Sequence, residues 1–189
     1  MSTYDQRHFE ALYDGEIDPW RFRESEYEAR KYRATIDALP SQRFSKCLEL
    51  GCSIGVLTRM LADCCDAIVA VDTSAKALSE ARNACFHLPV DFRRAHLPEG
   101  DFGEGFDLVV ASEVLYYLNP PALTRLARRL SRVVQPEAVC VAVHWTGETD
   151  YPMTADAAVQ LFEREAALER VEQRITEHYR LDVWGFSDS

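Results

Sequence analysis

A glycine turn followed by a distant carboxylate is the part of this sequence with the most recognisable chemistry. Glu49, Gly51 and Gly55 lie around a turn that ends one apolar run. Asp72 closes the next apolar run, Ala-Ile-Val-Ala-Val-Asp. Glycine permits a positive φ and lets the backbone approach a ligand closely. An acid about 20 residues after the first glycine is placed to accept hydrogen bonds from two ribose hydroxyls, so the pattern predicts a nucleoside-binding site.

The spacing of the glycines distinguishes between two kinds of cofactor. A dinucleotide fingerprint G-x-G-x-x-G that begins at Gly51 would need glycines where Ser53 and Val56 stand. The pattern is instead Glu49-x-Gly51-x-x-x-Gly55. It resembles motif I of class I S-adenosylmethionine (SAM) methyltransferases. The resemblance implies that SAM is the cofactor.

The carboxylate of Glu49 favours the same cofactor. NAD places a pyrophosphate over the first helix N-terminus, whereas SAM has no phosphate and puts its methionine portion there. A carboxylate near the turn would repel a pyrophosphate but suits the ammonium and sulfonium charges of SAM. The residues expected to bind the cofactor at the turn and after the second strand are Glu49, Gly51, Cys52, Ser53, Gly55, Asp72 and Thr73.

These residues need a parallel sheet to position them, and the pattern from residue 46 onward predicts one. Apolar strands alternate with helices, which implies β-α-β units with right-handed crossovers. In the tail, two strands with a short connection predict an antiparallel pair that closes the sheet edge. We expect an α/β fold with a Rossmann-like sheet of seven strands, mostly parallel with an antiparallel edge strand, and helices on both faces. Strands are expected over 46–50, 67–71, 90–94, 106–111, 138–144, 171–175 and 179–186, and helices over about 55–64, 74–85, 120–134 and 154–168.

The first 40 residues differ from the rest of the chain in being polar and rich in aromatic side chains. They are expected to be irregular at first and then helical from the N-cap Ser25. Such a segment would fold over the cofactor and exclude water, so Trp20 and Tyr27 are predicted to contact it. We expect residues 1–40 to form a lid segment and helix. Residues 41–189 would form the SAM-binding domain, within one compact domain.

The adenine site departs from the methyltransferase pattern. In methyltransferases with this motif, the acid after the third strand often contacts the adenine amino group. Here His96 stands in that place and Leu97 follows it. Leu97 can still contact adenine through its side chain or its backbone amide, so both residues are predicted cofactor contacts. The alternative for His96 is an ordinary loop residue.

The acceptor is expected at the carboxyl ends of the fourth and fifth strands. The run 106–118 resembles motif IV of the same methyltransferases and the loop that follows it. Ser112 and Glu113 leave the strand end, where ligands of open α/β sheets bind, and Tyr117 lies just beyond. His144 ends the fifth strand. We predict Ser112 as a cofactor contact and Glu113, Tyr117 and His144 as catalytic residues, with a structural role as the alternative for His144.

The beginning of the chain brings a closer resemblance. The runs that carry it are Asp18-Pro19-Trp20, Ser25-x-Tyr27-Glu28, Lys31-Tyr32 and Glu113-Val-Leu-Tyr-Tyr-Leu118. The NodS-like group of methyltransferases is similar to this chain over roughly residues 18–145. The named member of that group modifies an amino sugar in a chito-oligosaccharide signal. The resemblance implies methyl transfer to nitrogen or oxygen of a small molecule, such as an amino sugar or another carbohydrate-like acceptor. The protein would supply proximity, alignment and a dry site, and Glu113 or His144 could take the proton of an amine acceptor.

Composition argues against several other classes of function. The formal net charge is −10, and no basic stripe matches a phosphate backbone, so nucleic acid is not an expected partner. The six cysteines form no C-x-x-C pair, so neither a metal site nor a disulfide framework is expected. No run approaches the length of a membrane span and no signal peptide is evident, which predicts a cytoplasmic protein. The sequence leaves the oligomeric state open.

Two other functions stay open at this point. A catalytically inactive SAM-binding scaffold would bind the cofactor without an acceptor pocket, and the polar loop 144–156 argues against it. An NAD-dependent oxidoreductase would need the missing glycines and a Tyr-x-x-x-Lys pair past the fourth strand, which the sequence lacks.

Overall fold

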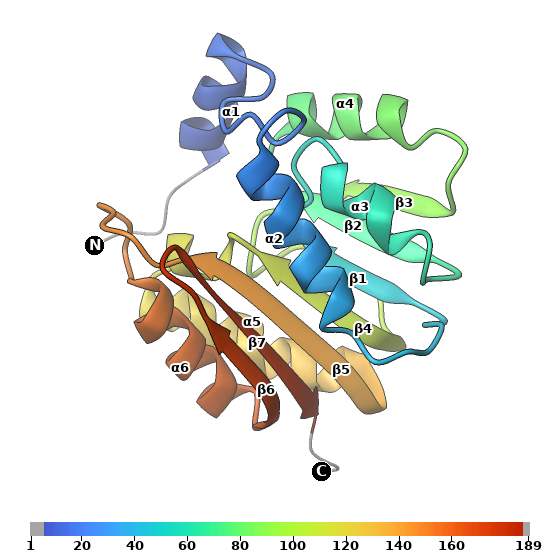
Figure 1. Ribbon diagram of the computed structural model, residues 1–189, viewed down its shortest axis with the longest axis vertical. Coiled ribbons are helices and arrows are strands. Elements are labelled where there is room, and N and C mark those ends of the chain that lie inside the picture. Colours follow the sequence, from blue (N-terminus) through green and yellow to red (C-terminus); the bar gives the residue numbers. More distant parts are fainter. Residues whose placement is uncertain (1–5, 187–189) are drawn as a thin grey trace.

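A seven-stranded sheet forms the centre of the protein (Figure 1). The computed structural model describes residues 6–186. The strands are β1 (Cys47–Leu50), β2 (Ile68–Asp72), β3 (Val90–Arg94), β4 (Phe106–Ser112), β5 (Val134–Trp145), β6 (Leu168–Ile175) and β7 (Tyr179–Phe186). They lie in the order β3-β2-β1-β4-β5-β7-β6, and β7 runs antiparallel to both of its neighbours. The predicted Rossmann-like sheet is confirmed.

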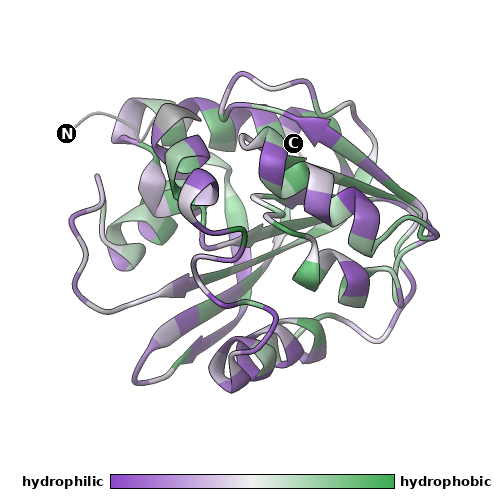
Figure 2. Cartoon of the chain, turned by 90° about the horizontal axis from the view of Figure 1, so that it is seen from above, coloured by the Kyte–Doolittle hydropathy of each residue, from purple (hydrophilic) through white to green (hydrophobic). Residues whose placement is uncertain are grey.

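The helices cover both faces of this sheet (Figure 1). They are α1 (Gln6–Gly15), α2 (Glu26–Asp37), α3 (Val56–Leu61), α4 (Ala75–Ala84), the short 3₁₀ helix η1 (Leu115–Tyr117), α5 (Pro120–Val133) and α6 (Ala155–Glu165). Alternate strand residues point to opposite faces and so build two cores. Leu48 and Val109 pack with α5 and α6, whereas Cys47 and Val110 pack with α2, α3 and α4. From above, both the strands and the helices carry hydrophobic and hydrophilic segments (Figure 2).

The chain ahead of the sheet is more ordered than the sequence predicts. Residues 6–15, expected to be irregular, form α1, which packs against α4. Glu10 accepts hydrogen bonds from the Ser74 hydroxyl at 3.1 Å and from the Ala75 amide at 3.0 Å. These groups form the first turn of α4, so a carboxylate from α1 stabilises the positive end of another helix. Residues 1–5 of the predicted lid lie outside the described part of the chain.

Two strands also begin earlier than expected. β5 starts at residue 134 and not 138, and its pairing with β4 is irregular at the start. β6 starts at residue 168 and not 171, because α6 ends at residue 165. Among residues 6–186, no helix has the length and apolar character needed to cross a bilayer.

Asp107 connects β1 and β4 at the amino-terminal ends of these strands. Its carboxylate accepts hydrogen bonds from the Ser45 amide and hydroxyl, each at 2.7 Å, and from the Lys46 amide at 2.8 Å. Asp107 is at the start of β4 and the other two residues lead into β1. The carboxylate therefore joins two neighbouring parallel strands at their amino-terminal ends.

Asp107→Ala should lower the free energy of unfolding by about 1–3 kcal/mol, because three donors lose a charged acceptor. Urea denaturation measures the change, and Glu104→Ala is the control because Glu104 is exposed. Equal stability of the two variants would show that Asp107 does not hold these strands together.

Candidate active site

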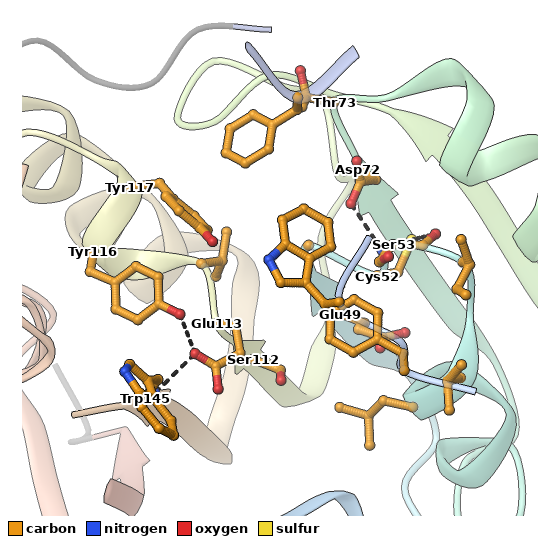
Figure 3. Close-up of a pocket in the computed structure, with 18 of the residues that line it drawn as sticks. Glu49, Cys52, Ser53, Asp72, Thr73, Ser112, Glu113, Tyr116, Tyr117 and Trp145 are labelled. Atoms are coloured by element: carbon orange, nitrogen blue, oxygen red, sulfur yellow. Dashed lines mark hydrogen bonds between the residues drawn. The ribbon is translucent and has the colours of Figure 1, made fainter. Parts of the chain in front are cut away.

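A cavity of about 570 Å³ opens at the carboxyl ends of the parallel strands (Figure 3). This is the edge at which ligands of open α/β sheets bind. Residues that follow β1 to β5 line one side, and residues from α1, α2 and the segment between them line the other. The cavity is therefore closed partly by the sheet and partly by the first 40 residues.

Most residues predicted from sequence lie in the cavity wall. These are Trp20, Tyr27, Glu49, Gly51, Cys52, Ser53, Asp72, Thr73, His96, Leu97, Ser112, Glu113 and Tyr117. Within the described chain, the wall does not include Gly55 or His144. Nor do residues 6–186 contain three or more His, Cys, Asp or Glu side chains grouped to hold a metal ion.

The turn after β1 is held against the end of β2. The Ser53 amide donates to Asp72 Oδ2 at 2.9 Å, and the Ser74 amide donates to Oδ1 at 2.8 Å (Figure 3). Gly51 has a φ of 75°, and a Cβ there would lie 3.2 Å from the Val114 side chain. The turn therefore needs glycine for both its conformation and its close packing. The Asp72 carboxylate faces the cavity with lone pairs left for a ligand.

Gly55 serves the packing of α3 against α4. It precedes α3 with a φ of 81°, and a Cβ there would lie 3.1 Å from the Ala81 Cβ on α4. The structure thus places Gly55 at a helix–helix contact that needs close approach, and its contact with the cofactor stays a prediction.

The sequence reasoning missed Tyr13, which lies on α1 and covers the side of the cavity next to Ser53 and Asp72. Its hydroxyl lies 2.5 Å from Ser53 Oγ, and its ring is 5.6 Å from that of Trp20. Burial raises the pKa of Tyr13 well above its usual range, and the nearby Asp72 carboxylate adds to this effect. The four-residue spacing from Phe9 to Tyr13 was the available signal, since it puts both rings on one helix face.

Glu49 is a buried acid at the end of β1. It is 1% exposed, and the Thr58 hydroxyl donates a hydrogen bond to its carboxyl at 2.6 Å. Burial raises the pKa of Glu49 to about 8, although the Thr58 hydrogen bond opposes this. The carboxyl is therefore protonated near neutral pH and becomes charged more readily if a cation binds beside it.

Glu113 is fixed as an ion where β4 ends. Its backbone has a φ of 55°, in the left-handed region that non-glycine residues seldom adopt. The carboxylate accepts hydrogen bonds from Lys31 Nζ at 2.5 Å, from the Trp145 amide at 2.9 Å and from the Tyr116 hydroxyl (Figure 3). Burial disfavours the charge, but Lys31 and the other donors hold the pKa of Glu113 below its usual range.

The sequence also gave no indication of the role of Lys31. It is 2% exposed, and its ammonium lies 3.0 Å from Glu28 Oε1 as well as against Glu113. The spacing of Glu28 and Lys31 on α2 is that of an ordinary surface ion pair. The pair is buried because α2 crosses the end of β4, which sequence alone does not reveal.

His144 lies behind the cavity wall. It is fully buried, and its Nε2 accepts the Leu115 amide at 3.1 Å. Burial lowers the pKa of His144 to about 4, so the ring is neutral. The histidine therefore anchors η1, which carries Tyr116 and Tyr117, and its Nε2 is already occupied.

Aromatic rings line the half of the cavity around Glu113. Tyr117 and Tyr151 have ring centroids 4.6 Å apart, and Tyr27 lies 5.9 Å from Trp145. Tyr27 also contacts Tyr179 on β7. Tyr27, which was expected to contact the cofactor, lies in the cavity wall in the first turn of α2, close to Lys31 and Trp145.

The strand order and the cavity at the carboxyl ends define the fold of class I methyltransferases. The solved N-methyltransferase NodS from Bradyrhizobium japonicum WM9, in complex with S-adenosyl-L-homocysteine, has a TM-score of 0.84 at 21% identity. That alignment covers 95% of this chain and 98% of that one. A solved structure from Pseudomonas syringae is 32% identical with a TM-score of 0.74, and the alignment covers 85% of this chain and 99% of that one.

The sequence profile of the family described as Nodulation protein S (NodS) matches residues 9–142. Nodulation protein S of Bradyrhizobium diazoefficiens is 30% identical over 149 residues, which are 74% of this chain and 68% of that protein. The Azorhizobium caulinodans protein is 26% identical over 119 residues, 62% of this chain and 56% of its own length. The chain thus spans a little over half to two thirds of these relatives. It belongs to the NodS family, and the predicted family is confirmed.

The raised pKa of Glu49 predicts a pH-dependent stability. The folded protein keeps this proton between about pH 4.5, the usual value, and about pH 8, whereas the unfolded chain releases it. The stabilising contribution is therefore complete below pH 4.5 and is lost as the pH rises through 8. The free energy of unfolding of Glu49→Gln, taken relative to that of the parent, should therefore increase by roughly 2–4 kcal/mol between pH 5 and pH 9.

Thermal or urea unfolding of the ligand-free protein at both pH values measures this gain. Glu16→Gln is the control because Glu16 is exposed. A stability difference between Glu49→Gln and the parent that does not change with pH would contradict a protonated Glu49.

Proposed function

We propose that the protein is a SAM-dependent methyltransferase that acts on nitrogen of a small-molecule acceptor, such as an amino sugar or another carbohydrate-like amine. The observation that carries the proposal is that one cavity contains two chemically different halves. One half has the glycine turn and Asp72, and the other has Glu113 and a wall of aromatic rings. Membership of the NodS family supports the same activity.

The residues of the first half fit SAM. Gly51 gives the turn the positive φ that brings its backbone to the cavity wall, and Asp72 has lone pairs for the ribose hydroxyls. Glu49 would face the methionine ammonium, and the buried Leu97 would pack on adenine beside His96. When bound, SAM supplies a methyl group activated by the sulfonium.

The residues of the second half suit an acceptor that is partly apolar and carries a charge. Trp145 and Tyr151 offer ring faces for the CH groups of a sugar, and Tyr117 offers a hydroxyl. Residues 1–40 would act as a cover that excludes water from the reaction, with Trp20 and Tyr13 over the cofactor half. Residues 41–189 would supply the binding domain. We assign His144 a positioning role through η1.

A methyl-transfer screen with labelled SAM over amines, amino sugars and hydroxylated small molecules tests the proposal. We expect transfer to amines. Asp72→Ala should weaken SAM binding by about 1–3 kcal/mol, because the ribose hydroxyls lose a charged acceptor. Asp91→Ala is the control, since Asp91 is exposed on β3 and pairs only with Arg93 among the described contacts.

Absence of both SAM binding and methyl transfer would contradict the proposed function. Normal SAM binding by Asp72→Ala would contradict only the placement of the ribose.

A further inference from the structure

Three charged side chains form a cluster in the wall of the acceptor half, which we call the α2 charge cluster: Glu28, Lys31 and Glu113. Lys31 Nζ lies 3.0 Å from Glu28 Oε1 and 2.5 Å from Glu113 Oε1. Lys31 is 2% exposed and Glu28 is 9% exposed. Two carboxylates thus share one ammonium, and the ionised cluster has one negative charge left over. A buried charge of this kind is stabilised by a cation that binds to it.

The two carboxylates differ in how completely they are hydrogen-bonded. Glu113 accepts from Lys31, from the Trp145 amide and from the Tyr116 hydroxyl. Glu28 accepts only from Lys31 among the described residues, and its buried Oε2 has no hydrogen-bond partner there. The Oε2 atom is 2.9 Å from Lys31 Nζ, but that contact lacks hydrogen-bond geometry.

A second buried polar atom next to Glu28 also lacks a partner in the described chain. It is the hydroxyl of Tyr27, whose ring lines the cavity and lies under the Lys31 ammonium at 5.2 Å. Buried polar atoms without partners are costly, and such atoms in a cavity wall indicate a missing ligand group. A positively charged group that donates hydrogen bonds would provide a partner for both Glu28 Oε2 and the Tyr27 hydroxyl.

The surroundings of Glu28 and Glu113 also shift the pKa values of these two residues in opposite directions. Burial raises the pKa of Glu28, although Lys31 opposes it, whereas Lys31 helps to hold the pKa of Glu113 below its usual range. In such a pair the two carboxyl groups can have different roles: Glu113 stays ionised, and Glu28 can accept and release a proton. The titratable groups that face Glu28 are Tyr27, Lys31 and Tyr32 of α2, Glu113 after β4, and Asp18 ahead of α2.

We propose that the α2 charge cluster binds the ammonium group of the acceptor and that Glu28 takes its proton. This inference rests on the proposed function and narrows it to primary or secondary amines that are charged at neutral pH. The ammonium compensates the remaining negative charge and donates to Glu28 Oε2 and the Tyr27 hydroxyl. A neutral hydroxyl acceptor would leave the charge uncompensated.

The proton transfer changes one bond on each partner. An N–H bond of the acceptor breaks, its electron pair stays on nitrogen, and the proton bonds to Glu28 Oε2. The acceptor is then a neutral amine with a free lone pair. Glu28 returns its proton to water after the product leaves, so the carboxylate is regenerated.

The other two candidate bases in this region are each held by donors of the protein. Glu113 has three donors on its two oxygens. His144 does not line the cavity within the described chain, and its Nε2 accepts the Leu115 amide. Glu113 is therefore a positioning residue that holds Lys31, and Glu28 is the catalytic residue.

The matched variants Glu28→Gln and Glu26→Gln test this assignment. Both residues are in the first turn of α2, but the Glu26 side chain is 91% exposed. Glu28→Gln should fold, because Lys31 keeps its pair with Glu113. Its turnover of an amine such as glucosamine should fall about 10²–10⁴-fold at pH 7, as expected for loss of a general base. Glu26→Gln should match the parent.

The pH profile separates proton transfer from a merely structural effect. In Glu28→Gln, turnover should rise with pH through the pKa of the acceptor amine, because free amine no longer needs a base. Affinity for S-adenosylhomocysteine should equal that of the parent, and circular dichroism should show that the variant is folded. A loss of turnover by Glu28→Gln that is equal at all pH values, or turnover within threefold of the parent, would overturn the proposal.

Calorimetry on the parent complex with S-adenosylhomocysteine tests binding without turnover. Glucosamine should bind, N-acetylglucosamine should not, and Glu28→Gln should lose the preference. If S-adenosylhomocysteine binds but only hydroxyl acceptors are methylated, or N-acetylglucosamine binds equally well, this inference fails while the proposed function survives. If S-adenosylhomocysteine does not bind and nothing is methylated, the proposed function fails.

Discussion

Lys31 lies where α2 crosses the end of β4, and its ammonium is buried between the carboxylates of Glu28 and Glu113. Removing one partner from a buried ion pair costs about 3–5 kcal/mol, so α2 cannot move off the sheet without separating these charges. The same contact fixes Glu113, which binds the Trp145 amide at the end of β5. The acceptor half of the cavity thus depends on a single ammonium that joins a helix to two strands.

The cofactor half is closed by a different set of polar contacts. Glu10 on α1 binds the first turn of α4 and also pairs with Arg94 at 2.8 Å, while Tyr13 contacts Ser53 beside Asp72. Exposed ion pairs contribute little stability, and Arg94 is about half exposed. The cover over the cofactor half is therefore attached less firmly than α2, which is consistent with its proposed role as a cover that admits SAM.

Sequence predicted the parts of the site that depend on local geometry. Gly51 and Asp72 belong to one β-α-β unit, whose turn and strand end are encoded within some 25 residues, so their spacing is informative. The burial of Lys31 depends on how α2 crosses the sheet, a contact 82 residues apart in the chain.

The placement of single residues was limited for a related reason. A strand end locates a residue but not the direction of its side chain, so His144 was expected in the cavity and lies behind it. Tyr27 was assigned to the cofactor from its segment alone, whereas the position of α2 puts it beside Trp145. The helix α1 was missed because its interactions with α4 are tertiary.

The central claim is that the glycine turn and its buried acid select SAM over a dinucleotide. Calorimetric titration of the protein with SAM and, separately, with NAD at the same pH tests it most directly. A cation beside Glu49 favours the ionised carboxylate, whereas the pyrophosphate of NAD would meet a buried acid in place of a positive charge, so we predict heat of binding for SAM and none for NAD. Binding of NAD as tight as that of SAM, or tighter, would contradict the account.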